Sequence, residues 1–322
     1  MKKKVFLTRT LHDFALKKLK KRYQIEIHSG KIPVPQSKLR SKIKEIDGLI
    51  CFPYDIINKS TIDLAKNLKV ISTYSVGFDH IDTKYAKKKK IRVGYTPEVL
   101  TDATADLAFS LLLDILRRIS EGDRIIRNGK WKVIYGAYDY VGIDLQGKTL
   151  GILGLGRIGK TLAKRAKAFD MKLVYHNRKR VSKTSEKTLG VKYVSFEKLV
   201  TQSDIISIHV PHTNQTDQMF NMKTFRKMKK SAFLINTSRG KIVNEKDLAV
   251  ALKKKIIAGA GLDVFEEEPI NQKHPLVKLQ NVVLAPHIGS STKETRVKMA
   301  EITVKNLELG MNGRSPIYSV GY

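Results

Sequence analysis

A glycine-rich turn between an apolar run and a helical pattern could bind phosphate groups. Residues 150–153 are typical of a buried strand, Gly154-x-Gly156-x-x-Gly159 follows directly, and residues 160–169 have the apolar spacing of a helix. In this context the three glycines permit a tight turn, a close approach of the backbone to a pyrophosphate and close packing of helix on strand. The helix N-terminus offers free N–H groups to the phosphates. The pattern predicts a dinucleotide site; the alternative is a glycine turn that only packs tightly.

Polar residues also follow three later strand-like runs. They occupy residues 236–240, 261–269 and 284–290. Because the carboxyl ends of parallel strands meet at one edge of a sheet, we expect these segments to converge where a nicotinamide would lie. A cation such as Arg239 can fix a carboxylate, and a histidine beside a carboxylate has its pKa raised toward the working range. Taken singly, Arg239, Glu268 and His287 also suit ordinary roles as an ion-pair residue, an exposed acid and a loop histidine.

The strand predicted at residues 172–176, after the glycine-rich turn, ends in a segment that bears on the choice of dinucleotide. A ribose-binding acid normally stands there, about 20 residues beyond the glycines. This sequence has Asn177 instead, followed by Arg178, Lys179 and Arg180. Arginine can fork onto a 2′-phosphate that a carboxylate would repel. The segment therefore favours NADP(H), with surface charge and NAD(H) as the alternative.

The elements that position these residues alternate along the chain. The strand-like runs of the first part are 4–8, 24–28, 48–52, 69–74 and 91–94, and the helix-like pieces between them are 11–20, 37–46, 60–67 and 82–89. Such alternation predicts a parallel sheet with crossover helices. A glycine turn at residues 74–79 ends one strand, where the N–H groups of Val76 and Gly77 could hold a small anion. An ordinary strand-to-helix turn is the alternative.

A long helical pattern opens the second part. Thr101 is expected to cap a helix that reaches about Ser120, and residues 121–144 are irregular and aromatic. The latter segment could pack on a neighbouring subunit, cover a cleft or simply pack as a loop. The later strand-like runs are 150–153, 172–176, 204–210, 232–236, 256–262 and 282–284, with helices at 197–200 and 245–253. They predict a six- or seven-stranded nucleotide-binding domain, followed by a last helix over 290–309.

Composition limits the other classes of function. The chain has 322 residues, 42% of them hydrophobic, and a formal net charge of +31. Its lysines are dispersed and no nucleic-acid motif occurs, so we expect a solvated basic surface rather than specific nucleic-acid binding. One cysteine, no apolar run of about 18 residues and no signal-peptide pattern favour a cytoplasmic protein without a membrane span. His209-x-x-His212 lacks further ligands, so no metal is expected.

Over nearly its whole length the sequence resembles the D-isomer-specific 2-hydroxyacid dehydrogenase family. The motifs that carry the resemblance are Ser75-Val76-Gly77, residues 96–105, Gly147-Lys148-Thr149 with the glycine pattern, His209-Val210-Pro211, residues 237–240, Asp263-Val264-Phe265 with Glu268-Pro269, and Pro286-His287-Ile288-Gly289. Within the family the chain looks most like the glyoxylate/hydroxypyruvate reductases. It departs at Tyr135, where the family often has a second tryptophan after the one at Trp131.

The resemblance implies a role for each site residue. Arg239 would hold the substrate carboxylate together with Ser75, Val76 and Gly77, His287 would exchange the proton, and Glu268 would keep His287 protonated. The implied cofactor residues are Thr104, Gly154, Leu155, Gly156, Arg157, Ile158, Gly159, Asn177, Arg178, Lys179, His209, Val210, Pro211, Thr237, Ser238, Asp263 and Gly289.

We therefore expect an α/β protein of two Rossmann-like domains, doubly wound parallel sheets with an active-site cleft between them. Residues 1–99 plus 289–322 would form a flavodoxin-like substrate domain and residues 100–288 the dinucleotide-binding domain. The expected reaction is reduction of glyoxylate or hydroxypyruvate to the D-2-hydroxy acid by NADPH, or less favourably NADH, in a homodimer. The alternatives are a dehydrogenase for another D-2-hydroxy acid, lactate or 3-phosphoglycerate, and a non-catalytic dinucleotide-sensing scaffold.

Overall fold

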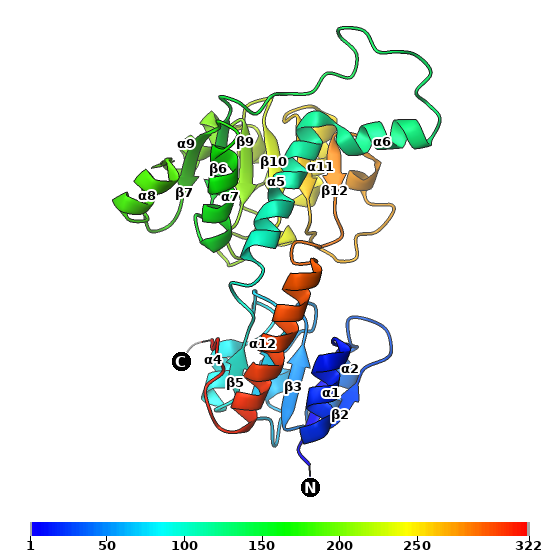
Figure 1. Cartoon of the computed structure of the whole chain (residues 1–322), viewed down its shortest axis with the longest axis vertical. Coiled ribbons are helices and arrows are strands. Elements are labelled where there is room, and N and C mark those ends of the chain that lie inside the picture. The colour runs from blue at the N-terminus through cyan, green and yellow to red at the C-terminus, as the bar shows by residue number, and fades with distance from the viewer. Residues whose placement is uncertain (1, 321–322) are drawn as a thin grey trace. The chain divides into compact units, whose positions relative to one another are not determined.

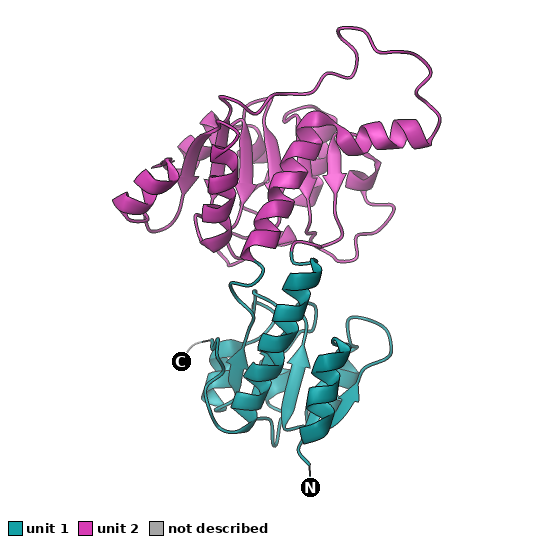
Figure 2. Ribbon diagram, viewed as in Figure 1, with its two compact units in different colours: residues 1–100, 290–322 teal, residues 101–289 magenta. Residues whose placement is uncertain are grey.

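The computed structural model describes residues 2–320 and divides the chain into two compact units (Figures 1 and 2). Unit 1 comprises residues 1–100 and 290–322, and unit 2 comprises residues 101–289. The predicted division differs from this one by a single residue at each boundary. The roles assigned to the two domains stay predictions.

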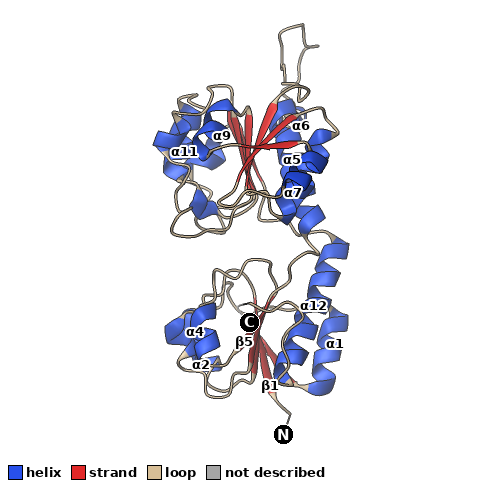
Figure 3. Cartoon of the chain, turned by 90° about the vertical axis from the view of Figure 1, so that its left-hand side faces the viewer, coloured by secondary structure: helices blue, strands red, loops and turns tan. Residues whose placement is uncertain are grey.

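Unit 1 is a five-stranded parallel sheet in the order β2-β1-β3-β4-β5, which is the flavodoxin order. Its strands are β1 (Lys4–Leu7), β2 (Gln24–Ile27), β3 (Gly48–Cys51), β4 (Val70–Thr73) and β5 (Arg92–Gly94). Its helices are α1 (Asp13–Arg22), α2 (Gln36–Lys42), α3 (Lys59–Ile62), α4 (Thr83–Lys88) and α12 (Lys293–Met311). Figure 3 shows α1 and α12 on one face of this sheet and α2 and α4 on the other. Because both faces are covered, all residues of β3 and β4 are buried, including the polar Ser72 and Thr73 of β4.

Unit 2 is a seven-stranded parallel sheet in the order β12-β11-β10-β9-β6-β7-β8. Its strands are β6 (Thr149–Leu153), β7 (Lys172–His176), β8 (Val191–Tyr193), β9 (Ile205–Ile208), β10 (Phe233–Asn236), β11 (Gly259–Leu262) and β12 (Val282–Leu284). The order reverses between β6 and β9, so the glycine pattern after β6 lies at the switch point of a doubly wound sheet. This arrangement confirms the predicted fold class.

Helices cover both faces of the second sheet. They are α5 (Thr101–Arg117), α6 (Ile119–Arg127), α7 (Arg157–Lys167), α8 (Lys183–Leu189), α9 (Phe196–Gln202), α10 (Met222–Phe225) and α11 (Glu245–Lys253), with the short 3-10 turns η1 (Gly240–Ile242) and η2 (Pro275–Lys278). Figure 3 places α5 and α7 on one face and α9 and α11 on the other. Two apolar clusters fill the two interfaces between sheet and helices.

Three local predictions are wrong. Residues 121–127 are helical, because Arg118 adopts a left-handed conformation, ends the preceding helix and pairs with Glu121 in the first turn of α6. The helix expected over 60–67 is the four-residue α3, capped by Asn58. Thr101 is the first residue of α5 rather than its cap.

None of the helices within residues 2–320 combines the length and the apolar character that crossing a bilayer requires.

Candidate functional site

The three glycines after β6 have different structural roles. Gly154 has a φ of +100°, and a Cβ there would lie 2.7 Å from the carbonyl carbon of His209. A Cβ on Gly159 would lie 2.3 Å from the carbonyl oxygen of Gly154, so this glycine lets α7 pack against the turn. A Cβ on Gly156 would meet nothing within 4 Å. Open space therefore lies beside Gly156, directly before a helix N-terminus that no side chain caps.

A pocket of about 690 Å³ opens at this turn. It is lined by Leu153, Gly154, Leu155, Gly156, His176, Asn177, Arg178, Lys179, His209, Val210, Pro211, Thr213, Gln215, Thr216 and Met219. The structure thus brings nine of the predicted cofactor residues together. The last four residues, 213–219, were missed by the sequence analysis, although the polar run after Pro211 follows a strand end and could have indicated them.

Asn177 braces the glycine turn. Its Oδ1 accepts a hydrogen bond of 2.7 Å from the N–H of Leu155. Arg178 and Lys179 line the pocket beside it. Arg180 does not line the pocket: its guanidinium forms two bonds of 2.7 Å with the carboxylate of Glu186. The expectation that Arg180 serves a 2′-phosphate is therefore wrong, because a carboxylate six residues further along binds it.

The strand-end histidine of the pocket is neutral. Burial lowers the pKa of His209 to about 4, and its Nε2 lies 2.8 Å from the hydroxyl of Ser207. His209 therefore adds no charge to the site at neutral pH. The neighbouring His212 pairs with Asp217 at 2.8 Å. Among residues 2–320 no group of three or more acidic, histidine or cysteine side chains could hold a metal ion.

Buried polar groups surround the ends of β10 and β12. The hydroxyl of Thr237 is buried and has no protein partner in the part of the chain that the structure describes. The hydroxyl of Thr104 donates to the carbonyl oxygen of Gly289 at 3.1 Å. An unpartnered hydroxyl, an open glycine cradle and a pocket of this size fit the dinucleotide that the sequence predicts.

Asp263 holds the turn that follows β12. Its two carboxylate oxygens accept hydrogen bonds from the N–H groups of Ile288 (2.7 Å) and Gly289 (2.8 Å). Burial raises the pKa of Asp263, and these two bonds act in the opposite direction. The turn matters because His287, with a φ of +54°, directly precedes it.

His287 and Glu268 form a close pair. The Nδ1 of His287 lies 2.6 Å from Oε2 of Glu268, and the other carboxylate oxygen accepts a bond of 2.9 Å from the N–H of Phe265. Both side chains are partly buried, at 27% and 14% exposure. The carboxylate thus fixes one ring nitrogen, which orients the imidazole for proton exchange through the other.

Arg239 follows β10 in an ordered turn. The side chain of Asn236 donates to the carbonyl oxygen of Arg239 at 2.9 Å and accepts from the N–H of Ser238 at 3.0 Å. Ser238 also donates to the carbonyl oxygen of Val210. Since β10, β11 and β12 are neighbours, Arg239, Glu268 and His287 all follow strand ends at one edge of the sheet.

The predicted substrate turn lies in unit 1. Ser75 donates to the carbonyl oxygen of Gly77 at 2.6 Å, and its hydroxyl lies 2.8 Å from that of Thr73. Within residues 2–320 the N–H groups of Val76 and Gly77 have no protein acceptor. Two N–H groups in such a turn suit a small anion.

A doubly wound sheet with a glycine cradle at its switch point, and with arginine, carboxylate and imidazole at the same edge, defines a dinucleotide-linked oxidoreductase. The model of the "D-isomer specific 2-hydroxyacid dehydrogenase, NAD binding domain" matches residues 109–289. The chain belongs to the D-isomer-specific 2-hydroxyacid dehydrogenase family.

Individual relatives agree with this family. The chain is 49% identical to the glyoxylate reductase of Thermococcus litoralis, across 98% of this chain and 96% of that protein. Its fold is similar to the NADPH-dependent glyoxylate/hydroxypyruvate reductase of Sinorhizobium meliloti in complex with NADP and malonate (TM-score 0.87, 29% identity, 100% and 97% covered). It is also similar to the D-lactate dehydrogenase of Aquifex aeolicus complexed with NAD and lactic acid (TM-score 0.85, 29% identity, 96% of each chain covered).

Two glycine variants test the cradle. Gly156→Ala adds a methyl group to open space, so we expect an unchanged thermal midpoint without cofactor and a dinucleotide Kd weakened at least about tenfold, because the methyl group occupies the place of a phosphate. Gly159→Ala forces α7 away from Gly154, so it should lower the thermal midpoint itself, by overpacking of about 1–3 kcal/mol. Differential scanning fluorimetry and fluorescence titration measure both. An unchanged Kd for Gly156→Ala would contradict the assignment of this pocket.

Proposed function

We propose that this protein reduces glyoxylate and hydroxypyruvate to the D-2-hydroxy acid with NADPH. The observation that carries the proposal is the 2.6 Å pair of His287 and Glu268 at the same sheet edge as the dinucleotide pocket. The name of the Thermococcus litoralis relative, at 49% identity, supports the substrate.

The proposed anion-binding groups are Arg239 in unit 2 and the turn at residues 75–77 in unit 1. A 2-keto acid carries a carboxylate, and a guanidinium can hold it by two parallel hydrogen bonds. In unit 1, the N–H groups of Val76 and Gly77 are donors that suit a small anion. Arg239 also polarises the keto oxygen, because developing negative charge on that oxygen is stabilised by a nearby cation.

The proton for the keto oxygen comes from His287. Its Nδ1 is held by Glu268, so Nε2 gives the proton to the oxygen as the carbonyl carbon is reduced. The carboxylate of Glu268 keeps the ring in one orientation for that step. In the oxidative direction the same nitrogen accepts the proton.

The dinucleotide, when bound, supplies the hydride. Residues 154–159 would hold its pyrophosphate at the N-terminus of α7, and residues 209–211 would lie beside the adenosine. Thr104, Thr237, Ser238, Asp263 and Gly289 would hold the nicotinamide end. Thr237 has a buried hydroxyl available for this purpose.

The preference for NADPH rests on the residues beyond β7. Asn177 carries no charge that would repel a 2′-phosphate, and Arg178 and Lys179 line the pocket next to it. Arg180 contributes nothing because Glu186 binds it. Two cations and no acid at this position favour NADP(H) over NAD(H).

A homodimer through unit 2 accounts for its exposed apolar segment. The long loop after α6 (Figure 1) exposes Trp131, Ile134, Tyr138 and Val141, and Ile134 and Tyr138 are 93% and 95% exposed. Exposed apolar side chains so close together are typical of a protein interface.

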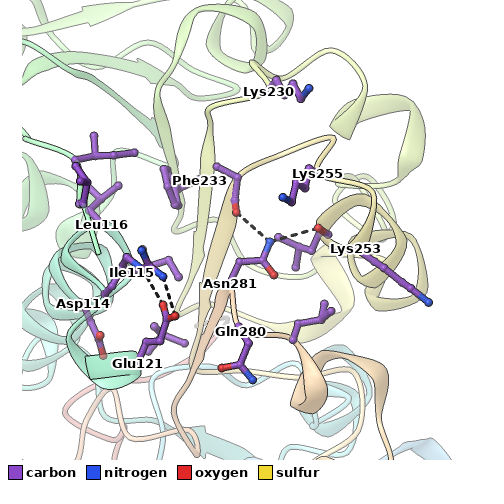
Figure 4. Close-up of a pocket in the computed structure, with 18 of the residues that line it drawn as sticks. Asp114, Ile115, Leu116, Glu121, Lys230, Phe233, Lys253, Lys255, Gln280 and Asn281 are labelled. Atoms are coloured by element: carbon purple, nitrogen blue, oxygen red, sulfur yellow. Dashed lines mark hydrogen bonds and ion pairs between the residues drawn. The ribbon is translucent and has the colours of Figure 1, made fainter. Parts of the chain in front are cut away.

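The same unit offers a receiving surface. A pocket of about 700 Å³ lies between the C-terminal end of α5 and the strand starts of β10 to β12. Figure 4 shows Ile115 and Leu116 on one side of it and Lys230, Lys253 and Lys255 on the other. Because one chain carries both the segment and the pocket, two copies related by a twofold axis can each receive the segment of the other.

Steady-state kinetics test the reaction. We expect the highest kcat/KM for glyoxylate or hydroxypyruvate with NADPH, above pyruvate and above NADH. Glu268→Gln should lower kcat/KM by about 10²–10⁴-fold, because the imidazole loses the anionic partner that orients it for proton exchange. The matched control is Glu267→Gln, an exposed neighbour that should stay within about twofold. A wild-type chain that reduces no keto acid with either cofactor would contradict the proposed reaction and favour the alternative of a non-catalytic dinucleotide-sensing scaffold.

Cofactor choice is tested at Arg178. Arg178→Ala should weaken the Kd for NADPH by about tenfold or more and leave the Kd for NADH unchanged, since a hydrogen bond to a charged group contributes about 1.5–3 kcal/mol. Arg180→Ala is the control, because its guanidinium is held by Glu186 outside the pocket. Equal effects of the two variants on both cofactors would show that Arg178 belongs to the general surface charge.

Mass photometry tests the dimer. We expect twice the chain mass of 36.4 kDa for the wild type and a single chain mass for Ile134→Asp combined with Tyr138→Asp, because buried unpaired carboxylates oppose association. Ile56→Asp, at a 58% exposed apolar position of unit 1, should leave the dimer intact. A wild-type monomer at micromolar concentration would contradict the proposal.

A further inference from the structure

A buried glutamate outside the proposed catalytic set is bonded to the loop that carries Glu268. Glu245, the first residue of α11, is only 6% exposed. Its Oε1 accepts a hydrogen bond of 2.7 Å from the N–H of Glu266, and its own N–H donates to Oε1 of Glu266 at 2.9 Å. These two reciprocal bonds join residues 21 positions apart and tie the start of α11 to the loop after β11.

That loop leads directly to the proton-exchanging pair. Two residues beyond Glu266, Glu268 accepts from the N–H of Phe265 and binds Nδ1 of His287. A shift of the backbone at residues 265–266 therefore moves the carboxylate that orients the imidazole.

The segment after Arg239 meets the same two residues. A Cβ on Gly240 would lie 1.9 Å from the carbonyl carbon of Phe265 and 2.3 Å from the N of Glu266, so the two backbones are in direct contact. Gly240, the residue next to Arg239, therefore touches the loop before Glu268. Glu245 is hydrogen-bonded to the same loop at Glu266.

The surroundings of Glu245 are acidic. Burial raises the pKa of its carboxyl to about 7, and the charges of Glu266, Glu268 and Glu267 act in the same direction. The imidazole of His274 also faces it, with Nε2 at 3.4 Å from Oε2. The carboxyl is therefore neutral below about pH 7 and charged above it, whereas its bond from the N–H of Glu266 needs only an oxygen.

We propose that Glu245 is a positioning residue for the reaction, which holds residues 265–266 against the segment after Arg239 and so sets the place of Glu268 and His287. This inference rests on the proposed function, because it requires that pair to carry the proton step. Glu245 is proposed to touch neither substrate nor cofactor and to act through its bonds with Glu266.

Two variants and one matched control test the inference. Glu245→Ala removes the side-chain bond to the N–H of Glu266, whereas Glu245→Gln keeps an acceptor oxygen at that place. The control is Asp247→Ala, on the same turn of α11, which removes a carboxylate bond of 2.8 Å to the N–H of Met222, a segment without site residues. All three are compared with the wild type by kcat and KM for glyoxylate, Kd for NADPH, thermal midpoint and pH profile.

We expect Glu245→Ala to lower kcat by about 10²-fold, since a misplacement of about 1 Å costs that much. KM and the Kd for NADPH should stay within about twofold, and Asp247→Ala should keep its kcat. Glu245→Gln should keep kcat within about twofold of the wild type, because its amide oxygen can still accept the bond from the N–H of Glu266.

A kcat for Glu245→Ala within twofold of Asp247→Ala, or a loss confined to KM and cofactor Kd, would overturn the inference while the proposed function stood. Where Glu245→Ala does not fold, Glu245→Asp decides, because its carboxylate is one methylene group shorter: a kcat within twofold of Asp247→Ala overturns the inference. A wild-type chain without reductase activity instead removes the proposed function itself.

Discussion

The hydrogen bond of 2.6 Å between His287 and Glu268 is the interaction on which the chemistry of unit 2 depends. It joins residues that follow two different strands, so it exists only because β11 and β12 pair in parallel, with Leu262 opposite Leu284. The pairing brings both strand ends to one edge. Asp263 then fixes the turn beyond His287, and the N–H of Phe265 fixes the carboxylate of Glu268. Each side chain of the pair is therefore held from its own strand before any ligand arrives, which is the preorganisation that proton transfer needs.

Electrostatics at this edge differ from those of the chain as a whole. The protein carries a formal net charge of +31, yet Glu266, Glu267 and Glu268 lie near the carboxyl of Glu245, and Glu268 and His287 lie near that of Asp263. Burial raises the pKa values of both Glu245 and Asp263. The cofactor side of the edge has the opposite character, with a neutral His209 and the cations Arg178 and Lys179. One sheet edge thus offers cations to phosphates and carboxylates to a histidine.

The sequence could predict features that depend on neighbouring residues and on strand order. The glycine pattern, the two parallel sheets and the family follow from short motifs and alternation, and the structure and comparisons confirm them. Features that depend on partners elsewhere were missed. The helix α6 is set by a left-handed Arg118 and its pair with Glu121. The three residues of β8 form a strand only beside β7. Glu245 looked like an ordinary helix start because its partner, Glu266, is 21 residues away. The roles of the site residues themselves remain predictions.

Asn177 shows how one side chain can keep the shape of a site while changing its charge. Its carbonyl oxygen holds the N–H of Leu155 at 2.7 Å, so it stabilises the glycine turn as a carboxylate there could. Unlike a carboxylate, it places no negative charge next to Arg178 and Lys179. Those two cations consequently have no acid from this strand end to neutralise them, while Glu186 binds only Arg180. The geometry of the phosphate cradle is thereby kept, and the charge around it is made more positive. This is the physical basis on which the pocket favours a dinucleotide with an additional phosphate.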